Sequence, residues 1–151
     1  MSFFDAINIA ASGLTAESVR MDVSAENLAN AETTNGPNGQ PYVPQEVVLQ
    51  QVGGSFSSAL AGALGTTTGT TGAAAPGGVE VGAIVNNPTP YQEVYDPTNP
   101  AANGKGYVKM PNVSTVTEMT DMIDEQNSYQ ADVTAMSTAK SMYTDSLDLL
   151  K

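Results

Sequence analysis

The chain has 151 residues, and its 16 acidic and 5 basic side chains give a formal net charge of −11. A nucleic-acid partner or insertion into a membrane is not expected, because Lys and Arg are not clustered and no stretch approaches the ~20 apolar residues of a span. The absence of Cys and His removes disulfides, thiol nucleophiles, the commonest zinc ligands and the side chain most used in acid–base catalysis.

The first predicted element is a helix over residues 3–30, which contain no Pro. Apolar residues recur along it at alternating steps of three and four, and the principal members of this seam are Ile7, Leu14, Met21 and Leu28. This 3.5-residue spacing is typical of a coiled coil. Gly13 costs ~1 kcal/mol relative to Ala inside a helix, so a closely packed neighbour is expected there. We expect the helix to end near Asn30, ahead of the Asn-Gly-Pro-Asn-Gly breaker run at 35–39.

Residues 35–112 are predicted to form a small β-rich insertion. Strand-like runs cover 42–52, 79–85, 91–95 and 106–110, separated by turn-forming residues.

Between the first two of these runs, the stretch 53–78 holds 8 of the 14 glycines and no charged residue, which predicts a flexible Gly/Thr/Ala-rich loop. Phe56, Leu60 and Leu64 lie at i, i+4 and i+8 within it, which fits a transient helical turn or a contact with a neighbouring subunit.

A second long helix is predicted from Thr115 to Leu150, with capping-box spacing between Thr115 and Glu118 and no Gly or Pro. It carries a matching seam, whose members are Met119, Met122, Tyr129, Val133, Met136, Tyr143, Leu147 and Leu150. Two such seams predict a mainly α fold in which the terminal helices pair as a coiled coil. Both helices are acidic, so we expect neighbouring subunits to contribute to their order. Function is therefore expected to rest on assembly.

Four carboxylates of the predicted second helix are candidates for a chemical site: Asp121, Asp124, Glu125 and Asp132. Paired carboxylates can cleave glycosides or bind a hard metal ion. A solvated acidic helix face is the favoured interpretation, because no loop that could capture a metal accompanies them. We predict no catalytic residue, no cofactor and no metal ligand.

The end of the first helix resembles the N-terminal signature of the bacterial flagellar rod, hook and hook-associated proteins. An Asn-x-Ala-Asn-x-x-Thr run closes the first helix in that family, and Asn27, Ala29, Asn30 and Thr33 match it. The Thr-Pro-Gly-Tyr that usually follows is altered here to the Thr-Thr-Asn-Gly of residues 33–36. Further along, Asp96, Pro97, Pro111, Asn112 and Val113 belong to motifs that look like those of the proximal rod members of this family.

The resemblance implies a structural axial subunit of the flagellar basal-body rod. Such a subunit passes through the flagellar type III export apparatus, and the N-terminus here does not look like a cleaved signal peptide. It assembles helically in the periplasm with copies of itself and other rod subunits, transmits torque and encloses the export channel. Residues 1–34 and 113–151 would form one axial coiled-coil domain, with 35–112 as its insertion. Another rod or hook subunit, a secreted coiled-coil adaptor and, less favoured, a peptidoglycan-cleaving enzyme are the alternatives.

Overall fold

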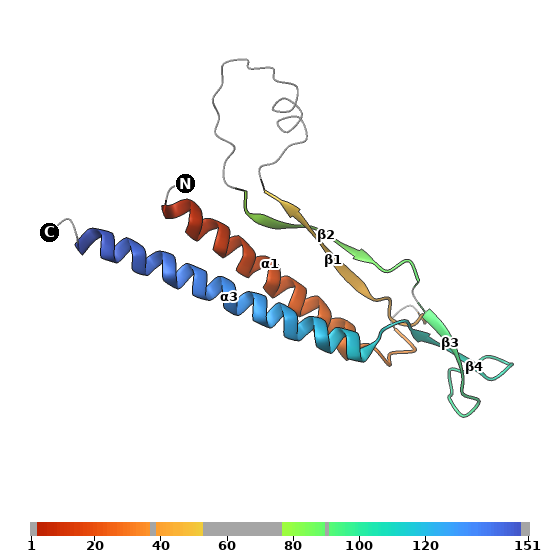
Figure 1. Cartoon of the computed structure of the whole chain (residues 1–151). Helices are drawn as coiled ribbons and strands as arrows, with labels where there is room; N and C mark the ends of the chain where they lie inside the picture. Colours follow the sequence, from red (N-terminus) through yellow and green to blue (C-terminus); the bar gives the residue numbers. More distant parts are fainter. Residues whose placement is uncertain (1–2, 37–38, 53–76, 90, 149–151) are drawn as a thin grey trace, which may run out of the picture.

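The computed structural model describes residues 3–36, 39–52, 77–89 and 91–148. A long helix begins the chain, two antiparallel hairpins follow, and a longer helix ends it (Figure 1). The elements are α1 (Phe3–Ala29), β1 (Gln45–Gln51), β2 (Val79–Asn86), β3 (Tyr91–Tyr95), β4 (Tyr107–Pro111) and α3 (Thr115–Asp148). Two long terminal helices around a small β-rich middle are what the sequence predicts. Neither described helix combines the length and apolar character that a membrane span requires.

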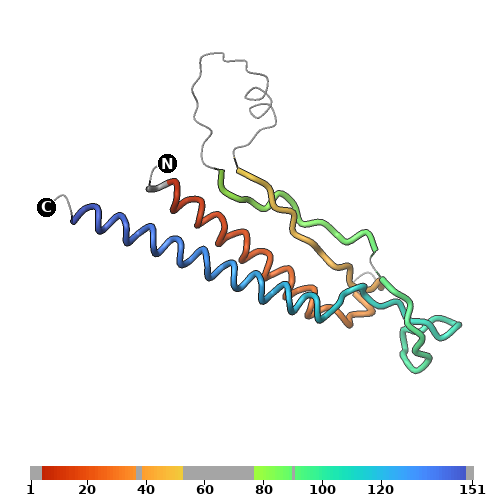
Figure 2. Tube along the Cα trace, viewed as in Figure 1, coloured from red at the N-terminus to blue at the C-terminus, as the bar shows by residue number. Residues whose placement is uncertain are grey.

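Helix α1 is the central element of the fold. It contacts α3 on one side and the β1–β2 hairpin on another, whereas α3 makes no comparable contact with a strand among the described residues. Figure 2 shows the two helices side by side, with the start of α1 and the end of α3 at the same end of the pair. The β3–β4 hairpin lies at the opposite end and pairs only within itself.

The two hairpins form separate two-stranded sheets. In the first, Gln45 pairs with Asn86 and Gln51 with Val79, and the register shifts between Val48 and Leu49 because Gly82 is an extra residue in β2. Such a bulge increases the local twist of the ladder, which helps a narrow hairpin follow a helix. In the second hairpin, β3 pairs with β4 in unbroken register from Tyr91–Pro111 to Tyr95–Tyr107.

The apolar core is thin. Prolines apart, four hydrophobic side chains are buried among the described residues: Ala10, Ala16, Val23 and Val108. Seventeen large hydrophobic side chains are exposed, and they lie on both hairpins and along α3. A domain of this size normally buries most of its large apolar side chains, so this surface is unusual for a monomer that acts alone.

Two local predictions about the helices meet different outcomes. The expected close neighbour of Gly13 is present, because a Cβ at this position would collide with the carboxylate of Asp132 on α3. The capping-box prediction is wrong by one residue. Ser114 caps α3: its Oγ accepts from the Thr117 amide at 3.4 Å and from the Thr117 hydroxyl at 2.9 Å. Glu118 is thereby free to face α1.

The predicted loop at 53–78 falls almost wholly outside the described residues, which resume at Gly77. The predicted contacts of Phe56, Leu60 and Leu64 also lie outside the described residues. The described residues on either side of this segment are joined, because the Val52 amide donates to the Gly78 carbonyl at 2.9 Å. The Val79 amide donates to Ser12 Oγ at 3.0 Å, which ties the start of β2 to α1.

Candidate functional site

Asn27 joins three elements near the end of α1. Its side-chain amide donates to the Gln45 carbonyl at 2.8 Å and to Glu118 Oε2 at 3.2 Å. Its Oδ1 accepts from the Tyr42 hydroxyl and from the Gln45 amide, both at 2.9 Å. The residue is 4% exposed, and these four bonds satisfy both donors and both acceptor positions of the amide. Asn27 therefore holds the start of β1 and the first turn of α3 against α1.

The approach of the chain to β1 depends on the turn that follows α1. The Tyr42 amide donates to the Thr33 carbonyl at 3.1 Å, so the segment after the turn runs back beside the helix. Pro44 is buried just before the strand, where a residue without an amide hydrogen removes no ladder bond. This return brings Tyr42 and Gln45 within reach of Asn27.

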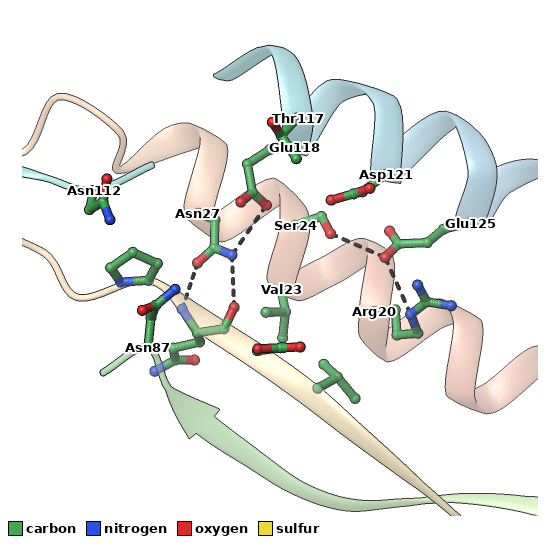
Figure 3. A pocket seen from close by; sticks show the side chains of 14 residues that line it. Arg20, Val23, Ser24, Asn27, Asn87, Asn112, Thr117, Glu118, Asp121 and Glu125 are labelled. Atoms are coloured by element: carbon green, nitrogen blue, oxygen red, sulfur yellow. Dashed lines mark hydrogen bonds and ion pairs between the residues drawn. The ribbon is translucent and has the colours of Figure 1, made fainter. Parts of the chain in front are cut away.

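One and two turns earlier in α1, Ser24 and Arg20 hold a second carboxylate of α3. Ser24 Oγ donates to Glu125 Oε1 at 3.2 Å, and Arg20 Nε lies 3.5 Å from the same oxygen (Figure 3). Arg20 is shared, because its Nη1 also lies 3.1 Å from Glu17 on its own helix. Glu125 is 3% exposed, and its Oε2 has no hydrogen-bond partner.

Burial disfavours the charged form of both carboxyl groups. It raises the pKa of Glu125 above its usual value, and the nearby Arg20 charge and the Ser24 bond offset this only in part. Burial likewise raises the pKa of Glu118, against the lowering effect of the Asn27 bond. The Asp121 carboxylate raises both pKa values further. The interface between α1 and α3 is thus short of positive charge.

These residues line a cleft of about 420 Å³ between α1, β1 and the first half of α3. Figure 3 shows that the side chains of Glu118, Asp121 and Glu125 lie in a row along α3. No group of three acidic side chains among the described residues is arranged to hold a metal ion. The cleft contains carboxylates, amides and hydroxyls, and its chemistry suits a cationic or hydrogen-bonding partner.

The family-motif residues at the end of α1 have separate roles. The Asn30 side chain donates to the Glu26 carbonyl at 3.0 Å and accepts from the Thr33 hydroxyl at 3.2 Å, which closes the helix end. The Thr33 amide also donates to the Asn30 carbonyl at 3.0 Å. Ala29 is exposed at the last helical position. Asn30 and Thr33 therefore shape the turn, whereas Asn27 connects the elements.

The motif around Asp96 shapes the turn after β3. Its Oδ1 accepts from the Thr98 hydroxyl at 2.7 Å and from the Thr98 amide at 3.1 Å. These bonds lower the pKa of Asp96. Pro97 packs beside Gly106, whose φ of +80° requires a glycine.

The second motif forms the connection from β4 to α3. Pro111 ends β4 and is fully buried. Val113 is half-buried, and the exposed Asn112 lines the cleft. This segment leads directly into the Ser114 cap, so it sets where α3 begins.

The predicted seam residues do not supply the polar contacts between the helices. Those contacts lie one position earlier: Gly13, Arg20 and Asn27 precede Leu14, Met21 and Leu28, while Glu118 and Asp132 precede Met119 and Val133. One position is about 100° of helix rotation. The coiled-coil pairing through the predicted seams therefore stays a prediction.

The seam residues differ in exposure. Ile7, Leu14, Met21, Leu28, Met122 and Met136 are half-buried. Met119, Tyr129, Val133, Tyr143 and Leu147 are exposed. Leu150 lies outside the described residues. Much of the predicted seam of α3 thus has no cover within one chain.

Comparisons with known proteins find relatives that align over nearly the whole length of the chain. Residues 7–37 match the family described as "Flagella basal body rod protein", and residues 105–149 match "Flagellar basal body rod FlgEFG protein C-terminal". The flagellar basal-body rod protein FlgC of Bacillus subtilis strain 168 is 43% identical over all of both chains. The chain belongs to the flagellar basal-body rod proteins.

Other rod proteins named FlgC agree with this assignment. Those of Escherichia coli O6:H1 strain CFT073 and Salmonella typhimurium strain LT2 are 42% and 40% identical, over 99% of this chain and 98% of theirs. The chain is thus a structural subunit of the flagellar basal-body rod. The two family matches cover both terminal helices and the junctions built by Asn27 and the β4–α3 connection.

Sequence reasoning recognised Asn27 as a motif residue but missed its contacts with Gln45 and Glu118. It also treated Glu125 and Asp132 as parts of a solvated face, and this interpretation is wrong for both: Glu125 is buried, and Asp132 lies against Gly13. The seven-residue interval between Glu118, Glu125 and Asp132 was the available signal, because it returns to the same helix face after two turns.

Proposed function

We propose that this rod protein belongs to the proximal rod and polymerises helically there with copies of itself and with other rod subunits. In this role residues 1–34 and 113–151 act as one axial domain, and 35–112 as its insertion. The assembled subunits surround the export channel and transmit torque. The predicted seam residues serve contacts between subunits.

The observation that carries the proposal is the uncovered apolar face at the start of α3. Val116, Met119 and Ile123 are 73%, 53% and 58% exposed, and their spacing of i, i+3 and i+7 places them on one side of the helix. Val133, further along, is 43% exposed. An apolar helix face without cover marks a protein interface, and a contact between unlike faces builds a helical filament.

We further propose that the subunit reaches the periplasm through the flagellar type III export apparatus without cleavage. The thin core supports this, because few apolar contacts oppose unfolding before passage. The absence of Cys from the sequence suits an oxidising destination. The mass of the subunit extracted from basal bodies should equal that of the translated chain, apart from the initiator Met.

The assembly proposal is tested by Met119→Asp and Ile123→Asp in a strain that lacks the native copy. Both side chains are exposed, so each change should alter the stability of the free chain by about 0.5 kcal/mol or less. Each should nevertheless reduce swimming and the amount of subunit in purified basal bodies. Ser128→Asp adds the same charge at an exposed polar position of α3 and is the matched control.

Normal swimming by both Asp variants would contradict the proposal. If rods form normally without the chain, a secreted coiled-coil adaptor becomes the better account. Release of fragments from purified peptidoglycan would favour an enzyme instead, although the residues of the cleft provide no histidine base.

A further inference from the structure

The cleft beside Asn27 has an uncompensated negative charge. Four carboxylates line it, those of Glu46, Glu118, Asp121 and Glu125, against the single guanidinium of Arg20. They leave a formal charge of −3 at the cleft, and Arg20 is shared with Glu17 outside it. From Thr115 to Asp132, α3 carries five acidic residues and no basic one.

A buried polar atom at this cleft lacks a partner. Glu125 Oε1 is held by Ser24 and Arg20, but Oε2 has no hydrogen bond, although the side chain is 4% exposed. A buried carboxylate oxygen without a donor is costly, so a positive charge placed in the cleft would stabilise the ionised Glu125 side chain. A metal ion is a poor candidate for the missing positive charge, because no carboxylates among the described residues are grouped closely enough to bind one.

Among the described residues, Lys105 is the cation best placed to supply this positive charge to the cleft of a second copy. Lys109 lies over the Tyr91 ring, 4.7 Å from its centroid, and Lys140 is on α3 itself. Lys105 is exposed in the turn between β3 and β4. Asn103 Oδ1 fixes this turn by accepting from the Lys105 amide at 2.9 Å and the Tyr107 amide at 3.1 Å.

The position of that turn points to a contact between chains. Neither β3 nor β4 contacts α3 within one chain, and Figure 1 shows their hairpin beyond the end of the helix pair. The hairpin also carries exposed Tyr95 and Tyr107, whose rings meet at 5.3 Å in an edge-on arrangement. An exposed aromatic surface with a lysine is chemically complementary to an acidic cleft.

We propose that the β3–β4 turn of one subunit docks at the acidic cleft of a second copy, with Lys105 placed among Glu118, Asp121 and Glu125. The contact joins unlike faces, so it propagates along an assembly and does not close a dimer. It deepens the proposed function, on which it rests, by naming one subunit contact within the rod.

Carbodiimide cross-linking of purified basal bodies tests the contact directly, because it joins an amine to an adjacent carboxylate as an amide. We expect a dimer of this chain that contains a peptide linking Lys105 to Asp121 or Glu118. Lys105→Arg retains the charge but removes the reactive amine. It should swim normally and lose this dimer.

Charge reversal provides the second readout. Lys105→Glu and Asp121→Lys should each reduce swimming, and the double variant should recover it. The controls are Lys140→Glu and Asp124→Lys, because both residues are exposed on α3 and neither lines the cleft. Both controls should swim.

The inference is overturned if basal bodies that contain the chain give no such dimer, if Lys105 is linked to a different subunit, or if Lys105→Glu swims normally. Absence of the chain from basal bodies would instead overturn the proposed function, and this inference with it. The two failures are therefore distinguishable in one preparation.

Discussion

Replacement of Asn27 by Ala tests whether this side chain holds α1, β1 and α3 together. The change removes four hydrogen bonds from a residue that is 4% exposed. Each bond contributes about 1 kcal/mol net, and the higher helix propensity of Ala returns about 0.6 kcal/mol. We therefore expect a loss of about 3 kcal/mol from the free energy of unfolding, a large share of the ~5–15 kcal/mol typical of a domain.

The assay is urea unfolding of the purified chain, followed by circular dichroism at neutral pH. Asn30→Ala is the matched control, because Asn30 belongs to the same motif but bonds only within the helix end. It removes two side-chain bonds and should cost at most about 2 kcal/mol, clearly less than Asn27→Ala. Asn27→Asp keeps the acceptor for Tyr42 but turns an oxygen toward Glu118, so its loss should be larger at pH 7 than at pH 4. Equal losses for Asn27→Ala and Asn30→Ala would refute the reasoning.

Three further predictions concern the same helix pair. Gly13→Ala should stabilise the chain by about 1 kcal/mol in an Asp132→Ala background. In the native background the gain should be clearly smaller, because the new Cβ meets the Asp132 carboxylate. Equal gains in urea unfolding would contradict this. The raised pKa values of Glu118 and Glu125 mean that their contribution to stability is fullest below about pH 4.5 and is lost as pH rises through the raised values. Glu125→Gln should therefore increase stability at pH 7 and flatten its dependence on pH, and an unchanged pH profile would argue against burial as the cause. Val133→Asp should cost the free chain no more than about 0.5 kcal/mol but reduce incorporation into basal bodies, and normal incorporation would remove Val133 from the assembly seam.

The sequence by itself determined the secondary structure, because local chemistry decides where helices and strands begin and end. Long runs without Pro give α1 and α3, and four β-branched or aromatic runs give the four strands. Helix α1 ends at Ala29, ahead of the breaker run at 35–39 and at the Asn30 turn. The neighbour of Gly13 could also be anticipated, since an interior glycine in a long helix indicates close packing. The motif at the end of α1 was sufficient to recognise the family.

Tertiary structure alone decided which face of each helix pairs within the chain. The predicted apolar seam contains Leu14 and Met119, and the face that pairs within the chain lies one position earlier in each helix. Both faces repeat with the same 3.5-residue period, so periodicity alone cannot show which one pairs. The choice depends on partners distant in sequence: Asn27 bonds Glu118, and Arg20 and Ser24 hold Glu125. Burial of these polar groups is tolerated because most of their hydrogen bonds are made, which leaves the more apolar face of α3 uncovered. The physical reason is that hydrogen bonds and ion pairs between residues distant in sequence select the paired face, and the periodicity of one helix contains no information about those partners.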